Sequence, residues 1–197
     1  IDQILSANGV KAVQFFINAG DTKTSGVDVV LNLSNVLAGK GRFGAVLSAN
    51  FNKSEIDKIN TPAALEAGGY DIFDRREQSL ITLSRPNSKV LLGLSYKTEK
   101  LSIHLDNTRF GEVTVTHASD PANDQVHTAK VITDLGLNYH IAKNLSITAN
   151  INNIFDMYPD ELDAKTGEDG GGRFVYSSIV QQQNFLGRTY SIGLQMK

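Results

Sequence analysis

Segments in which apolar and polar residues alternate with a period of two run through most of this 197-residue chain. Successive side chains of a β-strand point to opposite faces, so these segments predict strands with one apolar and one polar face. Seven segments show the pattern, and they predict strands of roughly ten residues, a length that crosses a bilayer at a tilt. They lie at residues 27–34, 43–52, 90–97, 101–106, 134–141, 145–152 and 190–196. No apolar run reaches the roughly twenty residues of a membrane-spanning helix.

Alternation alone fits both a soluble antiparallel sheet and a membrane β-barrel. Two features favour the barrel. The polar faces carry mainly Ser, Asn, Thr and Gly, which suits a crowded aqueous lumen better than a freely solvated surface. Aromatic residues also gather at the ends of the apolar faces, as in the girdles at the two membrane interfaces. They are Phe43, Tyr96 and Tyr139 at one end and Phe51, Phe155 and Tyr190 at the other, whereas Phe110 has the wrong parity.

The connections between the predicted strands alternate between short turns and long loops. Short turns fall near residues 37–41, 97–100 and 142–144, and long loops near 56–88, 112–129 and 157–186. Outer-membrane barrels sort their connections in this way, with short periplasmic turns and long extracellular loops. We therefore predict an all-β fold, an antiparallel transmembrane β-barrel. Unpaired strand edges are costly in lipid, so we expect these seven strands to be one part of a larger barrel.

Three segments resemble the TonB-dependent outer-membrane receptors. Residues 15–28 resemble a barrel strand with an aromatic residue, Asn, Ala-Gly and then Gly-Val-Asp; residues 150–159 resemble the penultimate strand; residues 187–194 resemble the closing strand. The resemblance implies that residues 1–197 are the C-terminal part of a barrel of about 22 strands with a plugged lumen. The plug domain and the segment that contacts TonB would then lie outside this chain.

The same resemblance implies TonB-dependent active import across the outer membrane of a Gram-negative bacterium, of a siderophore or another metal chelate. Expected partners are outer-membrane lipid and lipopolysaccharide, the plug in the lumen, TonB through the missing part, and a small-molecule ligand. Three alternatives stay open: a TonB-dependent glycan importer, a passive porin or autotransporter barrel, and a soluble β-sandwich binding module. The net charge of −2 offers no electrostatic footprint for nucleic acid.

Ligand contact is predicted for the first long loop, at Tyr70, Phe73, Arg75 and Arg76. Rings offer stacking surface and arginine binds anionic groups bidentately. The same residues could instead tie the loop to its neighbours or to lipopolysaccharide phosphates. We expect no catalytic site, cofactor or metal, because the chain lacks cysteine and its four histidines have no ligand spacing. These are His104, His117, His127 and His140.

Overall fold

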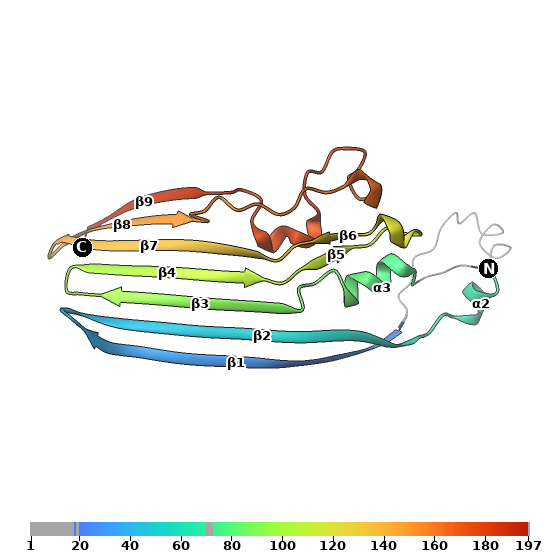
Figure 1. The fold of residues 1–197 in the computed structure, drawn as a ribbon, viewed down its shortest axis with the longest axis horizontal. Coiled ribbons are helices and arrows are strands. Elements are labelled where there is room, and N and C mark those ends of the chain that lie inside the picture. The colour runs from blue at the N-terminus through green and yellow to red at the C-terminus, as the bar shows by residue number, and fades with distance from the viewer. Residues whose placement is uncertain (1–17, 19, 70–72, 197) are drawn as a thin grey trace, which may run out of the picture.

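A computed structural model describes residues 18, 20–69 and 73–196 of the chain. In this part, seven strands form one antiparallel sheet in the order β1-β2-β3-β4-β7-β8-β9 (Figure 1). The strands are β1 (Gly20–Ala38), β2 (Gly41–Ile59), β3 (Ser88–Lys97), β4 (Leu101–Phe110), β7 (Lys130–Ala142), β8 (Leu145–Asn152) and β9 (Thr189–Met196). The seven predicted strands are confirmed. In the first family-like segment, residues 15–17 and 19 lie outside the described residues.

The register places the alternating residues on two distinct faces, because directly opposed residues point to the same side of a sheet. An apolar row crosses the sheet through Ala45, Leu94, Leu105, Leu135, Ile151 and Tyr190. The adjacent polar row runs through Gly44, Ser95, His104, Gly136, Asn150 and Ser191. A slip of one residue would exchange the two rows, so the sequence pattern and the register agree.

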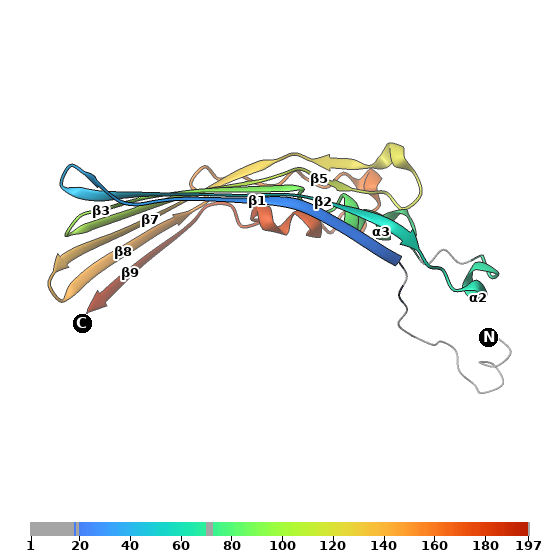
Figure 2. The ribbon, with the colours of Figure 1, turned by 90° about the horizontal axis from the view of Figure 1, so that it is seen from below.

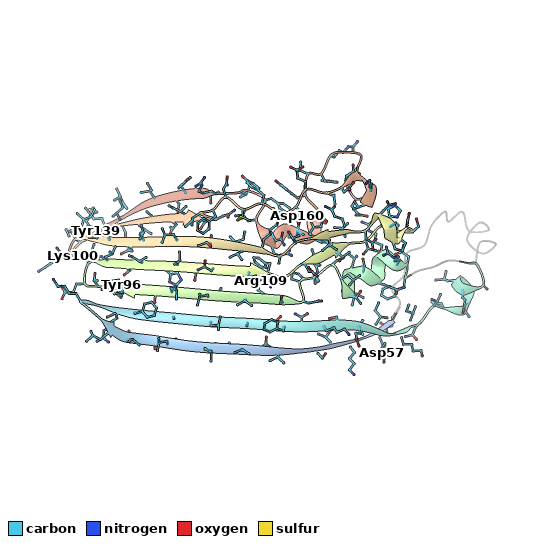
Figure 3. The ribbon with its side chains drawn as sticks, viewed as in Figure 1. Asp57, Tyr96, Lys100, Arg109, Tyr139 and Asp160 are labelled. Carbon is cyan, nitrogen blue, oxygen red and sulfur yellow. The ribbon has the colours of Figure 1, made fainter. Side chains whose placement is uncertain are left out.

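The apolar face is uncovered. Leu31 of β1 and Ile192 of β9 are 59% and 77% exposed. Within the described ranges, the one other sheet is a two-stranded ribbon of β5 (Val113–Val115) and β6 (Gln125–His127). A β-sandwich needs two sheets packed face to face, so the soluble sandwich reading is wrong. Figure 3 shows Tyr96 and Tyr139 near the turn end of the sheet, as expected for an interfacial girdle.

Strands β1 and β2 are longer than predicted, with 19 residues each. Beyond Val27 and Phe51 the pairing continues to Gly20 and Ile59 through residues that are mainly polar or charged. The Thr24 and Ser54 hydroxyls hydrogen-bond across this extension at 2.8 Å. Backbone pairing does not require an apolar face, so the strands continue where the apolar pattern stops.

All three tight turns lie at one end of the sheet and all three long connections at the other (Figure 1). The turns fall at residues 39–40, 98–100 and 143–144, as predicted. The long connections hold α2 (Ala63–Glu66), α3 (Arg75–Thr82), the β5–β6 ribbon and the 3-10 helices η1 (Pro121–Asn123), η2 (Ala164–Thr166) and η3 (Ser178–Gln183). None of the helices in the described ranges is long and apolar enough to cross a membrane.

The sheet is curved. Figure 2 shows β8 and β9 bending away from the plane of β1–β4, toward the side on which the 3-10 helix η3 lies. Helix η3 and the residues after it line a pocket together with Thr108 and Asp134, which belong to the polar face. The polar face is therefore the concave one, as the inner wall of a barrel would be.

Candidate functional site: a braced cap of three connections

The three long connections form a cap at one end of the sheet, here defined as residues 60–69, 73–87, 111–129 and 153–188. Val113, Val115 and Val180 are buried within it. The first and second connections join through their backbones, since the Thr114 N–H donates to the Leu83 carbonyl at 3.0 Å. The Ser84 hydroxyl also donates a hydrogen bond of 3.0 Å to the Thr114 carbonyl. The cap thus has its own small core.

Helix α3 sets the positions of the two predicted arginines. The Asp74 carboxylate accepts from the Glu77 N–H at 2.9 Å and caps the helix. Arg75, in the first turn, donates to the His117 carbonyl at 2.7 Å and to Asp124 Oδ1 at 2.8 Å, and its second guanidinium nitrogen pairs with Asp124 Oδ2. The hydrogen bond from Arg75 lowers the pKa of Asp124 from its usual value, against the effect of burial. Arg75 therefore fastens the first connection to the second.

Arg76 points to a different partner. Its guanidinium pairs with the carboxylate of Glu168 in the third connection. The Phe73 ring lies at the start of β1, where it approaches Gly20, and Tyr70 lies outside the described residues. Among the described predicted residues, both arginines are engaged by carboxylates of this chain. Ligand contact at the four positions stays a prediction. The geometry of Arg75 and Arg76 fits the alternative that these residues tie the first long loop to its neighbours.

Asp160 ties the third connection to the second. Its carboxylate accepts from the Thr128 N–H and hydroxyl at 2.6 and 2.8 Å and pairs with Lys130 Nζ at 2.5 Å. Burial acts to raise the pKa of Asp160, but the hydrogen bonds from Lys130 and Thr128 outweigh it and lower the pKa from its usual value. The Gln125 side chain adds two hydrogen bonds between the same connections. Its amide nitrogen donates to the Glu161 carbonyl, and its amide oxygen accepts from the Asp163 N–H.

The family-like segment after β8 builds a tight turn. Asn153 is fully buried with a φ of 52°, a left-handed conformation that Asn adopts more readily than most residues. Its side chain donates to the Met157 carbonyl at 2.7 Å and accepts from the Met157 N–H at 2.9 Å. Gly187, just before β9, has a φ of 67° and lies against the Tyr158 ring, so a side chain there would be both strained and crowded.

Three of the four histidines lie in different surroundings. His117 Nδ1 accepts from the Ser119 and Asp120 N–H groups, His127 is fully buried in β6, and His104 pairs with Asp106 within the sheet at 2.8 Å. In the ranges that the structure describes, no group of three or more His, Asp or Glu residues is arranged to hold a metal ion.

A stack of three aromatic rings in the third connection was not predicted. Tyr176 lies between Tyr158 and Phe185, with ring centroids 6.3 and 5.4 Å away and nearly parallel planes. The three residues have no regular spacing and occupy a loop without periodicity. The aromatic content of the loop was the one signal that could have suggested the stack.

The comparison with family models identifies this architecture. The model described as "TonB dependent receptor-like, beta-barrel" matches residues 1–154. The chain belongs to the TonB-dependent receptor family. The resemblance of the sequence is thus confirmed, and the matching family model is that of TonB-dependent receptors rather than of porins or autotransporters. Proteins of this family are receptors and transporters rather than enzymes. No curated protein matches the chain in a sequence search.

Solved receptors share the fold. The ferric-catecholate import receptor Fiu of E. coli K12 has a TM-score of 0.55 at 17% identity, over 90% of this chain and 21% of its own. The pyoverdine outer-membrane receptor FpvA of Pseudomonas aeruginosa PAO1 has a TM-score of 0.54 at 18% sequence identity. The match covers 89% of this chain and 21% of FpvA. A mutant of the ferric enterobactin receptor PfeA of Pseudomonas aeruginosa has a TM-score of 0.52 at 17% sequence identity. The match covers 88% of this chain and 22% of PfeA. The chain therefore spans about a fifth of the length of these receptors.

Proposed function

We propose that the chain is the C-terminal, seven-stranded part of a TonB-dependent importer in the outer membrane of a Gram-negative bacterium. Membership of the TonB-dependent receptor family carries this proposal. The uncovered apolar face supports it, because exposed Val, Leu and Ile side chains on a sheet are stabilised when acyl chains shield them from water. Outer-membrane lipid and lipopolysaccharide are the partners of this face. The plug domain, and the segment through which TonB supplies energy, lie outside this chain.

The proposed cargo is a siderophore or another metal chelate. Fiu imports ferric catecholates, PfeA is a ferric enterobactin receptor and FpvA binds pyoverdine. The cap supports a receptor role, because its cross-links hold three connections in one arrangement over the concave face. In this proposal Tyr70 and Phe73 offer ring surface to the ligand, while Arg75 and Arg76 hold their segment in place.

A growth and uptake assay tests the proposal. The gene for the full-length receptor is deleted, and uptake of radiolabelled iron is measured from catecholate, hydroxamate and pyoverdine-type chelates. We expect uptake from one chelate class to be lost in the deletion strain and in a strain without TonB, and restored by the receptor gene on a plasmid. Ferrous iron uptake serves as the control and should not change.

Two outcomes contradict the proposal. Uptake that depends on the receptor but persists without TonB would remove energised import. A deletion strain that takes up every chelate normally but fails to grow on an oligosaccharide would replace the chelate with a glycan as the cargo.

A further inference from the structure

Two pairs of like charges occupy directly opposed positions on the concave face. Arg42 of β2 lies opposite Lys97 of β3, and Asp106 of β4 lies opposite Asp134 of β7. Like charges in such positions are destabilising. Because Lys97 is also opposite Ser102 of β4, the positive pair lies four residues closer to the turns than Asp106 does, which is roughly 13 Å along the strand. The turn end of the face is thus basic and its middle is acidic.

Neither pair is neutralised within the described ranges. There the Arg42 guanidinium donates to a backbone carbonyl at 3.3 Å, Lys97 is exposed, and no carboxylate pairs with either of them. Asp106 contacts the imidazole of His104 at 2.8 Å, and Asp134 accepts from a backbone N–H. In the same ranges neither carboxylate pairs with a lysine or an arginine. Counter-charges from outside this part of the chain would remove the repulsion in both pairs.

A pocket of about 580 Å³ joins the basic and the acidic part of the face. Arg42 and Lys97 line it at the turn end, Asp106 lines it at the other end, and Gly44 and Gly93 lie between them. Glycine inside a strand marks positions where another backbone approaches closely. A Cβ added at Gly93 would meet the Asp106 carboxylate at 2.9 Å, so the glycine keeps this part of the wall open. The pocket therefore suits a segment of polypeptide.

We propose, on the basis of the import function above, that this pocket docks an extended segment of the plug domain with one acidic and one basic side chain. The acidic side chain pairs with Arg42 and Lys97, and the basic one pairs with Asp106 beside Asp134. Four residues of extended chain span roughly 13 Å, so the two side chains lie about four positions apart and on one face of the segment. Electrostatic complementarity fixes register, and the two contacts therefore set the position of the segment along the barrel wall.

Photo-cross-linking in the purified full-length receptor identifies the occupant. The photoreactive residue p-benzoylphenylalanine replaces Ser95, which lines the pocket between its two ends. The irradiated receptor is digested, and the cross-linked peptides are sequenced by mass spectrometry. We expect cross-links to one segment that precedes residue 1 in the full-length receptor and has an acidic and a basic residue about four positions apart.

Hydrogen exchange of the cross-linked segment tests the two charge contacts. We expect exchange to become about fivefold faster or more when Arg42→Gln is combined with Lys97→Gln, and also in Asp106→Asn. Raised salt concentration should have the same effect in the wild type. Lys143→Gln is the matched control and should change nothing, because Lys143 is an exposed lysine in a neighbouring turn and does not line the pocket.

A charge exchange separates pairing from a general loss of stability. Lys97→Glu should speed exchange of the segment, and a lysine placed at the acidic position of the segment should restore the wild-type rate. Heat-modifiable migration in gels verifies that each variant folds. Lys97→Gln alone replaces any variant that does not fold.

The outcomes separate this inference from the proposed function. Cross-links to lipid, to lipopolysaccharide or to a second copy of the receptor overturn the docking site, as does the lack of any cross-link to an upstream segment. Wild-type exchange rates in the charge variants also overturn it, and chelate import then stands. Charge-dependent docking in a receptor that imports no chelate removes the import function and leaves the docking site in place.

Discussion

The carboxylate of Asp156 accepts a hydrogen bond of 2.7 Å from the backbone N–H of Arg188. Asp156 lies in the turn after β8, and Arg188 directly precedes β9. The Arg188 side chain also donates to the Ile154 carbonyl at 3.3 Å. The segments that resemble the penultimate and closing strands of the family therefore meet in space. This junction sets the pairing of β8 with β9, which begins at Asn152 and Thr189.

Substitutions at Asp156 should show how much stability depends on its left-handed backbone conformation and on its hydrogen bond to Arg188. Asp156 has a φ of 56°, which is costly for a β-branched residue by about 1–2 kcal/mol. We expect Asp156→Val to lower the free energy of unfolding by at least that amount, because it also loses the bond to Arg188. Asp156→Asn keeps an acceptor and tolerates the left-handed conformation, so it should be nearly neutral. Urea unfolding of the receptor in detergent checks this; equal losses in the two variants would contradict it.

Removal of the Arg75 guanidinium should loosen the cap. Arg75→Met loses the bidentate pair with Asp124 and the bond to the His117 carbonyl. We expect faster amide exchange in α3 and in residues 116–124, and no further change when Asp124→Asn is added. Arg85→Met is the control, because Arg85 lies in the same connection and has no carboxylate partner in the described residues. Weaker chelate binding with unchanged exchange would instead make Arg75 a ligand contact.

Acidification should open the β5–β6 ribbon. Burial, opposed by the nearby Asp160, lowers the pKa of His127 from its usual value. The unfolded ribbon therefore binds a proton more readily than the folded one, and stability is lost as the pH falls below about 6.5. Asp124 and Asp160 have lowered pKa values, so their contribution is lost only at lower pH, as the pH falls through their folded-state pKa values.

Hydrogen exchange of the β5 and β6 amides, corrected for intrinsic rates, measures this effect between about pH 7.5 and pH 5.5. We expect protection to fall over this range in the wild-type receptor and to stay level in His127→Phe. The paired extension of β1 and β2 provides the control. Constant protection of β5 and β6 in the wild type would rule out the titration of His127 as the cause.

Neighbouring positions on β3 should respond oppositely to a charge. Leu94 belongs to the apolar row and Ser95 to the polar row. Lysine on the lipid face of a barrel costs about 2–4 kcal/mol near the bilayer midplane, so Leu94→Lys should reduce the folded receptor in the outer membrane. Ser95→Lys faces the lumen and should be tolerated better. Heat-modifiable bands in membrane fractions report the outcome, and equal yields would argue against the assignment of the faces.

Much of the architecture follows from the sequence by itself. The two faces of each strand and the sorting of turns and long connections were predicted correctly, because alternation and turn residues report local geometry and burial. The three family-like segments indicated the TonB-dependent receptors for a similar reason, since turn residues such as Asn153 and Gly187 occupy conformations that few residue types adopt.

Contacts between distant segments were decided by the tertiary structure. The partners of Arg75 and Arg76 depend on how three connections meet once the strands are in order, and no local pattern records that. The ends of β1 and β2 depend on backbone pairing, which continues where the apolar pattern stops. Strands β5 and β6 have three residues each, too few for a period. The place of Asp106 beside Asp134 follows only from the register, because the side of a sheet that a residue occupies is a property of the paired strands.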